Sequence, residues 1–206
     1  STAHWDHTGG GEADANGDAI FNGAVDNATG TAGLLELARV WGTGPRPERS
    51  IVMISFTAEE SGLLGSEYYA ANPIYPLEKT VAGFNMDAMN VYGRVEDLGV
   101  IGYGQSELDE RLAAAAARQG REIAPDANPA AGSYFRSDHF PLAKRGVPMA
   151  YAEGGGEFRD EPKAAREAAR EEYGSRRYHQ ADDEWSPDWD LAGQVEDLEE
   201  ALWIGR

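Results

Sequence analysis

The chain has 206 residues, which is enough for one domain with a substantial buried core. Its 36 acidic and 18 basic residues give a formal net charge of −18, which argues against nucleic acid and against an anionic membrane surface as partners. The sequence has no cysteine and no apolar stretch near the ~20 residues of a membrane span. We therefore expect neither disulfides, nor thiolate metal sites, nor membrane insertion of this chain.

Strands and helices are predicted to alternate along the chain. Helices are predicted where apolar residues recur at helical spacing, and strands where short apolar runs lie between turn residues. In chain order the predicted elements are a strand stub ending at His4, a helix over 30–41, a buried strand over 51–56, a helix over 61–71, strands over 81–86 and 98–103, an Ala-rich helix over 107–119, a loop with a short helix over 134–148, a strand over 147–152, a solvated helix over 163–173 and an amphipathic helix over 191–204. The alternation favours an α/β fold with helices on both faces of one sheet, and we expect a single domain over 1–206.

Acids and histidines follow the predicted strands. His4 ends the first strand, Glu59 and Glu60 follow the second, and Asp87 follows the third. In open α/β sheets the ligand crevice lies beyond the carboxyl ends of the strands, so these side chains should converge. The two adjacent glutamates repel each other at the end of a buried strand and need a compensating positive charge.

Two loop residues could join this group, although each polar residue also has a simpler interpretation. Asp26, in "NGAVDNATG", could cap the following helix, and His179, in "RRYHQADDEW", could be an exposed loop residue. Glu59 could be a first-turn acid of the next helix and Asp87 a turn residue. Taken together, two imidazoles with several carboxylates and no thiols form a ligand set that suits zinc, cobalt or manganese.

Six segments carry a family resemblance, and they are "AHWDHTG", "DAIFNGAVDNATGTAGLLELARV", "SFTAEESGLLGSEYYA", "NMDAM", "RSDHFPLAKRGVPMAY" and "YHQADDEW". In this order they resemble the successive blocks of the M28 zinc peptidases, which comprise co-catalytic di-zinc aminopeptidases and their relatives. The resemblance covers most of residues 3–190. It implies a three-layer sandwich with a mixed, mostly parallel central sheet. The first strands of such a domain usually lie upstream, so we expect this chain to be an excerpt of a longer protein that lacks them.

The resemblance also implies a set of metal ligands. One zinc ion would be held by His4 and Asp87, and a second by Glu60 and His179. Asp26 would bridge the two ions. The implied cofactor is therefore two Zn²⁺ per chain, with Co²⁺ or Mn²⁺ as possible substitutes.

The same resemblance assigns catalytic roles. Glu59 would be the general base for a metal-bridging hydroxide that attacks the peptide carbonyl. Asp6 would orient the imidazole of His4, and Tyr134 occupies the place of a tyrosine that stabilises the oxyanion in some members. The peptide bond of Asp26-Asn27 should be cis, as is common in the family.

Other polar residues near the motifs have smaller predicted roles. The family does not use His7 or His139 as ligands, so we expect both to serve in packing or hydrogen bonding. Asp183 could support the loop of His179. Glu153 could face the free amine of the substrate or be an exposed acid at the rim of the site.

The resemblance favours a zinc-dependent exopeptidase that hydrolyses N-terminal residues from peptides or small proteins. Three alternatives remain: glutaminyl cyclase-like chemistry with one zinc ion, a carboxypeptidase, and a non-catalytic binding domain on the same fold. A carboxypeptidase needs basic residues near the site, for which Arg136 and Arg145 are the candidates. The family favours a secreted or periplasmic location, and the sequence carries no signal for an oligomeric state.

Overall fold

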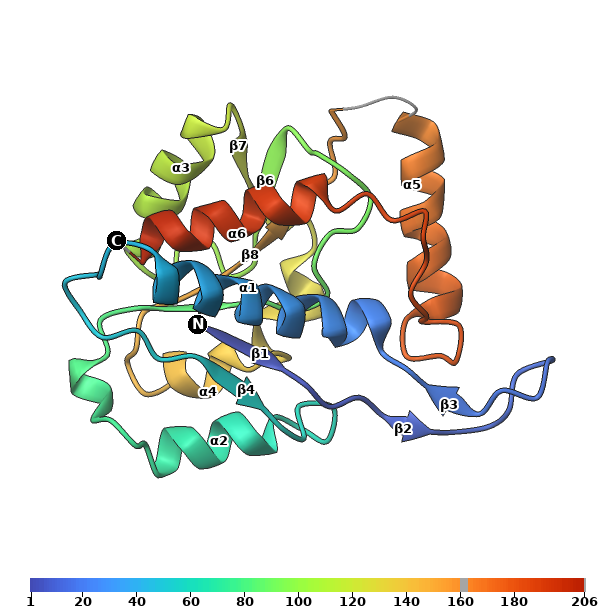
Figure 1. Cartoon of the computed structure of the whole chain (residues 1–206), viewed down its shortest axis with the longest axis horizontal. Coiled ribbons are helices and arrows are strands. Elements are labelled where there is room, and N and C mark those ends of the chain that lie inside the picture. Colours follow the sequence, from blue (N-terminus) through green and yellow to red (C-terminus); the bar gives the residue numbers. More distant parts are fainter. Residues whose placement is uncertain (160–162, 206) are drawn as a thin grey trace.

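The computed structural model describes residues 1–159 and 163–205, and its centre is a six-stranded sheet. The sheet has the strand order β4-β1-β5-β8-β6-β7, and helices cover both of its faces (Figure 1). The described strands are β1 (Thr2–His4), β4 (Ile54–Phe56), β5 (Gly83–Asn85), β6 (Asp97–Val100), β7 (Glu122–Pro125) and β8 (Met149–Gly154), with a separate hairpin of β2 (Gly9–Gly10) and β3 (Ile20–Phe21).

The sheet is mixed and mostly parallel, which confirms the predicted α/β architecture. Strand β1 pairs in parallel with β4 and β5, and β5 pairs in parallel with β8. Strand β6 is antiparallel to β8 and parallel to β7. Four neighbouring parallel strands therefore point their carboxyl ends to the same edge, where an open α/β sheet forms its ligand crevice.

The helices form two outer layers. Helices α1 and α6 lie next to each other in front of the sheet in Figure 1, while α2 and α4 pack on each other and on the opposite face. No helix within residues 1–159 and 163–205 has the length and apolar character needed to cross a membrane. The helices are α1 (Gly30–Thr43), α2 (Leu64–Ala71), α3 (Leu108–Arg118), α4 (His139–Ala143), α5 (Lys163–Glu172) and α6 (Ala192–Ile204), with single turns at Ala24–Thr29, Leu77–Lys79, Pro129–Ala131, Ser133–Phe135 and Tyr173–Arg177.

Each outer layer buries its own apolar cluster. The larger cluster joins α1, α3 and α6 to the sheet, and the smaller joins β4, α2 and α4 to β8. Full burial of one large apolar side chain stabilises the fold by about 1.5–3 kcal/mol. The larger cluster includes Leu34, Leu37, Phe84, Met86, Leu98, Leu112 and Leu198, and the smaller consists of Phe56, Ala70, Leu142, Val147 and Met149.

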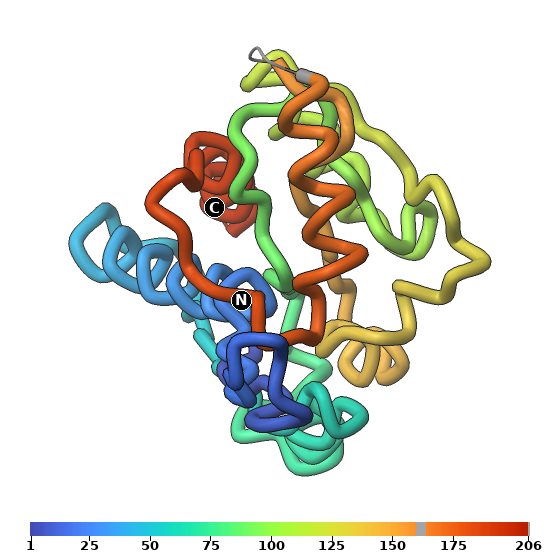
Figure 2. The backbone as a smooth tube through the Cα atoms, turned by 90° about the vertical axis from the view of Figure 1, so that its right-hand side faces the viewer, coloured from blue at the N-terminus to red at the C-terminus, as the bar shows by residue number. Residues whose placement is uncertain are grey.

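Helix α5 differs from its prediction, because it is anchored to the rest of the chain and not only solvated. It runs along the side of the molecule that faces the viewer in Figure 2. Arg166 donates hydrogen bonds to the carbonyl of Tyr92 and, over 2.9 Å, to Asp190 Oδ2. Arg170 donates to the carbonyl of Gly155 over 2.8 Å. Two arginines on one face of α5 thus hold it beside loops that lead to the crevice.

The structure differs from the predicted elements at two further places. The run 51–56 was predicted as a buried strand, but only Ile54–Phe56 is a strand, and Ser55 is exposed. Among the described strands, β4 pairs with β1 alone and so lies at an edge of the sheet. Strand β7 and the β2–β3 hairpin were not predicted, because Glu122, Pro125 and the glycines of β2 lack the apolar pattern of a strand.

Candidate metal centre

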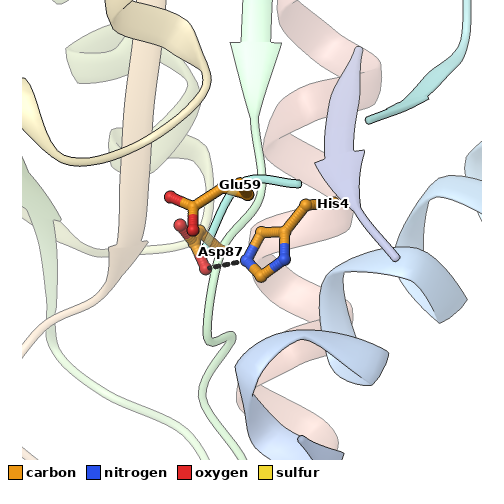
Figure 3. Close-up of side chains that lie close together, drawn as sticks. All are labelled: His4, Glu59 and Asp87. Atoms are coloured by element: carbon orange, nitrogen blue, oxygen red, sulfur yellow. Dashed lines mark hydrogen bonds and ion pairs between the residues drawn. The ribbon is translucent and has the colours of Figure 1, made fainter. Parts of the chain in front are cut away.

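The carboxyl ends of β1, β4 and β5 bring three of the predicted site residues together. His4 is the last residue of β1, Glu59 follows β4, and Asp87 follows β5. Each of them offers a possible ligand atom, and these atoms lie within 4.8 Å of one another. Figure 3 shows the carboxyl groups of Glu59 and Asp87 lying beside the ring of His4. The parallel register of the sheet therefore produces the convergence that the sequence predicted.

Five predicted ligands surround one space. His4 Nε2 lies 3.1 Å from Asp87 Oδ1 and 3.2 Å from Asp26 Oδ1. His179 Nε2 lies 3.2 Å from Asp26 Oδ2 and 3.2 Å from Glu60 Oε2. Asp26 thus turns one carboxylate oxygen toward each imidazole. We call the pair His4 and Asp87 the His4 pole, and the pair Glu60 and His179 the His179 pole.

The spacing of these atoms fits zinc. Zinc bonds to histidine nitrogen and carboxylate oxygen are about 2.0–2.1 Å long, so neighbouring ligands of a tetrahedral ion are separated by roughly 3.3 Å. The donor atoms of the two poles and Asp26 are separated by 3.1–3.2 Å. The residues present therefore fit the metal in both chemistry and distance.

The turn that carries Asp26 has an unusual backbone. The peptide bond of Asp26-Asn27 is cis, as the resemblance implied. The side chain of Asn27 donates to the carbonyl of Met86 over 3.0 Å and accepts from the N–H of Gly30 over 2.9 Å. Asn27 therefore links this turn both to the end of β5 and to the start of α1.

Asp183 holds the same turn from the other side. Its carboxylate oxygens accept hydrogen bonds from the N–H groups of Val25 over 2.9 Å and Asp26 over 3.1 Å. The side chain is fully buried, and burial raises its pKa although these hydrogen bonds favour the charged form. The sequence predicted support for the loop of His179, whereas the carboxylate holds the turn of Asp26. Because Asp183 follows His179 by four residues, it joins the two segments.

Asp87 is held by a buried chain of hydrogen bonds that the sequence did not reveal. Ser137 donates to Asp87 Oδ2 over 2.6 Å, and Asn85 Nδ2 donates to Ser137 Oγ over 2.7 Å. Thr2 in turn donates to Asn85 Oδ1 over 2.6 Å. Oδ2 of Asp87 is thereby occupied, and Oδ1 is the oxygen that lies beside His4.

Left-handed backbone conformations occur next to the site. Ala58 precedes Glu59 and has a φ of 56°, Ala88 follows Asp87 with a φ of 51°, and His179 itself has a φ of 57°. Residues other than glycine are held in this region at a cost of roughly 1–2 kcal/mol, and such strain is concentrated at functional sites.

The electrostatics of the site favour charged carboxylates beside positive groups. Burial opposes charge on His4, but its hydrogen bonds with Asp26 and Asp87 raise its pKa to about 12. Burial likewise opposes charge on Asp26, but hydrogen bonds with His179 and His4 hold its pKa well below the usual range. Without a metal, the imidazoles would thus be protonated. A bound cation would take the place of these protons, so metal binding would release protons.

Glu59 has the opposite environment. Burial, followed by the negative charge of Asp87, raises the pKa of Glu59 to about 9. Its backbone N–H donates to Asp6 Oδ1 over 3.2 Å. The carboxyl group itself lies beside Asp87 and His4 in Figure 3. A cation at the His4 pole would offset the charge of Asp87 that raises this pKa.

Asp6 orients His4 differently from the prediction. His4 Nδ1 hydrogen-bonds to the backbone carbonyl of Asp6 over 3.0 Å. The carboxylate oxygen Oδ1 lies 3.9 Å from the same nitrogen, beyond hydrogen-bonding distance, and accepts from the N–H of Glu59. The ring of His4 is therefore held by a carbonyl, and the carboxylate fixes the segment of the expected base.

The remaining candidates lie around this centre. The ring of Tyr134 packs over Gly102 and edge-on against His139, at a centroid distance of 5.0 Å, and its proposed oxyanion role remains a prediction. His139 is fully buried between Tyr134 and Tyr151, and burial lowers its pKa to about 4, which fits the expected packing role. Glu153 lies within β8, and burial raises its pKa to about 7.

Comparison with known proteins identifies the family. The family model described as "Peptidase family M28" matches residues 1–202, so the chain belongs to this family. The mouse protein Aminopeptidase NAALADL1 is 47% identical over 76 residues, which are 34% of this chain and 10% of that protein. This match spans only a small part of the mouse protein.

Two solved structures show the breadth of the fold. A Zn-dependent exopeptidase from Parabacteroides distasonis superimposes with a TM-score of 0.62 at 20% identity and covers 99% of this chain and 69% of its own. The glutaminyl cyclase of Porphyromonas gingivalis superimposes with a TM-score of 0.59 at 20% identity. This match covers 99% of this chain and 67% of the cyclase chain. Both likenesses confirm a zinc exopeptidase-like fold, while the reaction has to be inferred from the site. The chain thus belongs to peptidase family M28 and spans only part of the length of the relatives that it matches.

Proposed function

We propose that this chain carries the catalytic centre of a zinc-dependent aminopeptidase that uses two metal ions. The observation that carries the proposal is the division of Asp26 between two imidazoles. Its Oδ1 lies 3.2 Å from His4 Nε2, and its Oδ2 lies 3.2 Å from His179 Nε2. One carboxylate with an oxygen at each pole supports a pair of cations in preference to a single one.

In this proposal each pole would hold one ion and Asp26 would contact both. When bound, the two zinc ions would polarise the scissile carbonyl and lower the pKa of a water molecule near them. Ser137 occupies Oδ2 of Asp87 through a 2.6 Å hydrogen bond and so leaves Oδ1 for the metal. Metal-ligating carboxylates are commonly fixed in this way by hydrogen bonds from neighbouring residues.

Glu59 would move the proton. It would accept a proton from the attacking water as the new C–O bond forms, and would deliver it to the leaving nitrogen as the C–N bond breaks. A positioned group of this kind contributes about 10²–10⁴-fold to the rate. The anchor between its backbone N–H and Asp6 supports this role, because a proton carrier has to be held at a fixed place.

Surrounding charges favour a substrate with a free amine. A C-terminal carboxylate would need a fixed cation beside the metals. Both candidates for that role, Arg136 and Arg145, are exposed. The names of relatives include both substrate ends, because the mouse relative is named an aminopeptidase and a Caenorhabditis elegans relative a glutamate carboxypeptidase homolog, so the choice rests on these charges.

The test is a set of matched substrates on zinc-loaded protein. We expect hydrolysis of aminoacyl-p-nitroanilides and no hydrolysis of the same compounds after N-acetylation. Peptides with C-terminal glutamate and peptides with N-terminal glutamine complete the set. Release of C-terminal glutamate, or cyclisation of the glutamine without peptide hydrolysis, would contradict the proposal.

A further inference from the structure

His7 lies against the metal centre without belonging to the set of predicted ligands. Its side chain is only 6% exposed, and that of Glu60 is 8% exposed. His7 Nδ1 lies 2.6 Å from Glu60 Oε1, although the two residues are 53 positions apart in the chain. The sequence suggested only a general packing or hydrogen-bonding role for this histidine, and the structure gives it a specific partner.

The distance between His7 Nδ1 and Glu60 Oε1 indicates a hydrogen bond and not two ligands of one metal ion. Two ligands of one zinc ion are separated by roughly 3.3 Å, as the other donor atoms of the site are, whereas 2.6 Å is a short charge-assisted hydrogen bond. An ionised carboxylate only accepts hydrogen bonds, so the proton lies on Nδ1 of His7. His7 therefore donates to Glu60 and occupies its Oε1.

This hydrogen bond leaves the other oxygen of Glu60 at the His179 pole. Glu60 Oε2 lies 3.2 Å from His179 Nε2, a separation that fits two ligands of one ion. The arrangement repeats what Ser137 does at the other pole, where it occupies Oδ2 of Asp87 and leaves Oδ1 beside His4. Each pole thus has a carboxylate with one oxygen occupied and one oxygen facing the site.

Packing fixes the ring of His7 in this position. A side chain at Gly23 would bring its first carbon to 2.6 Å from Cγ of His7, so the ring lies directly on the backbone of the turn that leads to Asp26. The ring also meets that of His179 edge-on, at a centroid distance of 5.6 Å. His7 consequently contacts the segments of Glu60, Asp26 and His179 at once.

We propose that His7 is a positioning residue that restricts Glu60 to one metal-binding oxygen and so sets the zinc affinity of the His179 pole. The inference rests on the proposed two-zinc centre. Without the hydrogen bond, Glu60 could rotate or offer both oxygens. Loss of such an indirect contact typically weakens metal binding by about 10–100-fold.

The experiment compares three variants with the wild-type chain. His7→Leu fills the space without a donor, and His7→Asn places an amide N–H₂ near the position of Nδ1. Leu112→Ala, in the core of α3, serves as the control for lost stability. We would measure zinc stoichiometry and both dissociation constants by competition with a chromophoric chelator, and Tm by circular dichroism.

We expect two ions in the wild type, a second ion bound about 10–100-fold more weakly in His7→Leu, and recovery of most of this loss in His7→Asn. Leu112→Ala should lower Tm and keep both affinities. Two wild-type ions with unchanged affinities in His7→Leu would overturn this inference alone. Equal loss in His7→Leu and His7→Asn would also overturn it. Fewer than two ions in the wild type would overturn the proposed function and this inference with it.

Discussion

Two clusters of buried acids in this chain are neutralised in different ways. On α6, Asp197 and Glu200 are fully buried, and Arg121 Nη1 lies 2.7 Å from the first and 3.5 Å from the second. At the metal centre, Asp26 and Asp87 face imidazoles instead of a guanidinium. A buried charge is tolerated only when it is paired, so the α6 cluster contains its own cation. At the metal centre the positive charge would instead come from protonated imidazoles or, in the proposed function, from metal ions that take the place of those protons.

The geometry of the two clusters supports this difference. The guanidinium of Arg121 also donates to the carbonyl of Asp97 over 3.0 Å, and Asp197 accepts from the N–H of Gly154 over 3.0 Å. These contacts tie β6, β8 and α6 together. At the metal centre, by contrast, hydrogen bonds from Ser137 and His7 occupy one oxygen each of Asp87 and Glu60 and leave the other facing the shared space. Both oxygens of Asp26 face imidazoles.

The largest expected effect is on catalysis. Glu59→Gln keeps the shape of the side chain and removes the proton acceptor, so kcat should fall by about 10²–10⁴-fold. The variant should still bind two zinc ions, because Glu59 is not one of the proposed ligands. Steady-state kinetics and elemental analysis on the same zinc-loaded sample check both parts. A variant with wild-type turnover would show that another residue carries the proton.

The next effect is on stability and involves the other cluster. Arg121→Met removes the cation from two buried acids, and the free energy of unfolding should fall by about 3–5 kcal/mol. Zinc content should not change. Urea unfolding would measure the loss, with Lys144→Met as the control, because Lys144 pairs with Glu67 at the surface and such pairs contribute only about 0–1 kcal/mol. Equal stability of the two variants would refute the claim that Arg121 neutralises the cluster.

A smaller effect, on zinc affinity, is expected when Asp183 can no longer hold the turn of Asp26. Asp183→Asn replaces one acceptor oxygen by a donor that faces a backbone N–H, so the turn of Asp26 should loosen. Zinc affinity should fall by about 10–100-fold. The neighbouring exposed Asp182→Asn is the matched control. Chelator competition would compare the two variants, and unchanged affinity in Asp183→Asn would contradict the role of Asp183 in fixing the turn.

The α6 cluster should also make the stability of the chain depend on pH. Burial outweighs the charge of Arg121 and raises the pKa of Glu200 from its ordinary 4.5 to about 8. The folded chain therefore binds this proton more tightly, and the resulting stability is complete below pH ~4.5 and is lost as the pH rises to ~8. Glu200→Gln should remove this term, so its Tm relative to the wild type should rise between pH 5 and pH 9. A constant difference in Tm across that range would refute the shift.

The sequence predicted the convergence of polar side chains at the strand ends better than it predicted the edges of the sheet. His4, Glu59, Glu60 and Asp87 follow predicted strands, so the parallel order of the sheet was enough to expect their convergence. The place of Asp26 and the role of each residue were implied by the family resemblance. The elements that it missed have weak local patterns. Strand β7 (Glu122–Pro125) contains a charge and a proline, and β2 (Gly9–Gly10) consists of glycines.

The supporting contacts could not be predicted for a different reason. His7 meets Glu60 across 53 positions, and Ser137 meets Asp87 across 50. Neither pair shares a motif or a periodicity, and each depends on the register of strands and on loop backbones. Whether the acceptor for His4 is the carboxylate or the carbonyl of Asp6 likewise depends on a loop conformation that one sequence does not specify.

The most direct measurement is the zinc content of the wild-type chain beside Glu60→Gln, determined by elemental analysis after equilibration at one free-zinc concentration. We predict two ions per chain in the wild type and loss of the more weakly held ion in Glu60→Gln, since the substitution removes an anionic ligand of the His179 pole. Added zinc should partly restore the second ion. A wild-type chain that retains no zinc, or a Glu60→Gln variant that retains two ions as tightly as the wild type, would contradict the proposed centre.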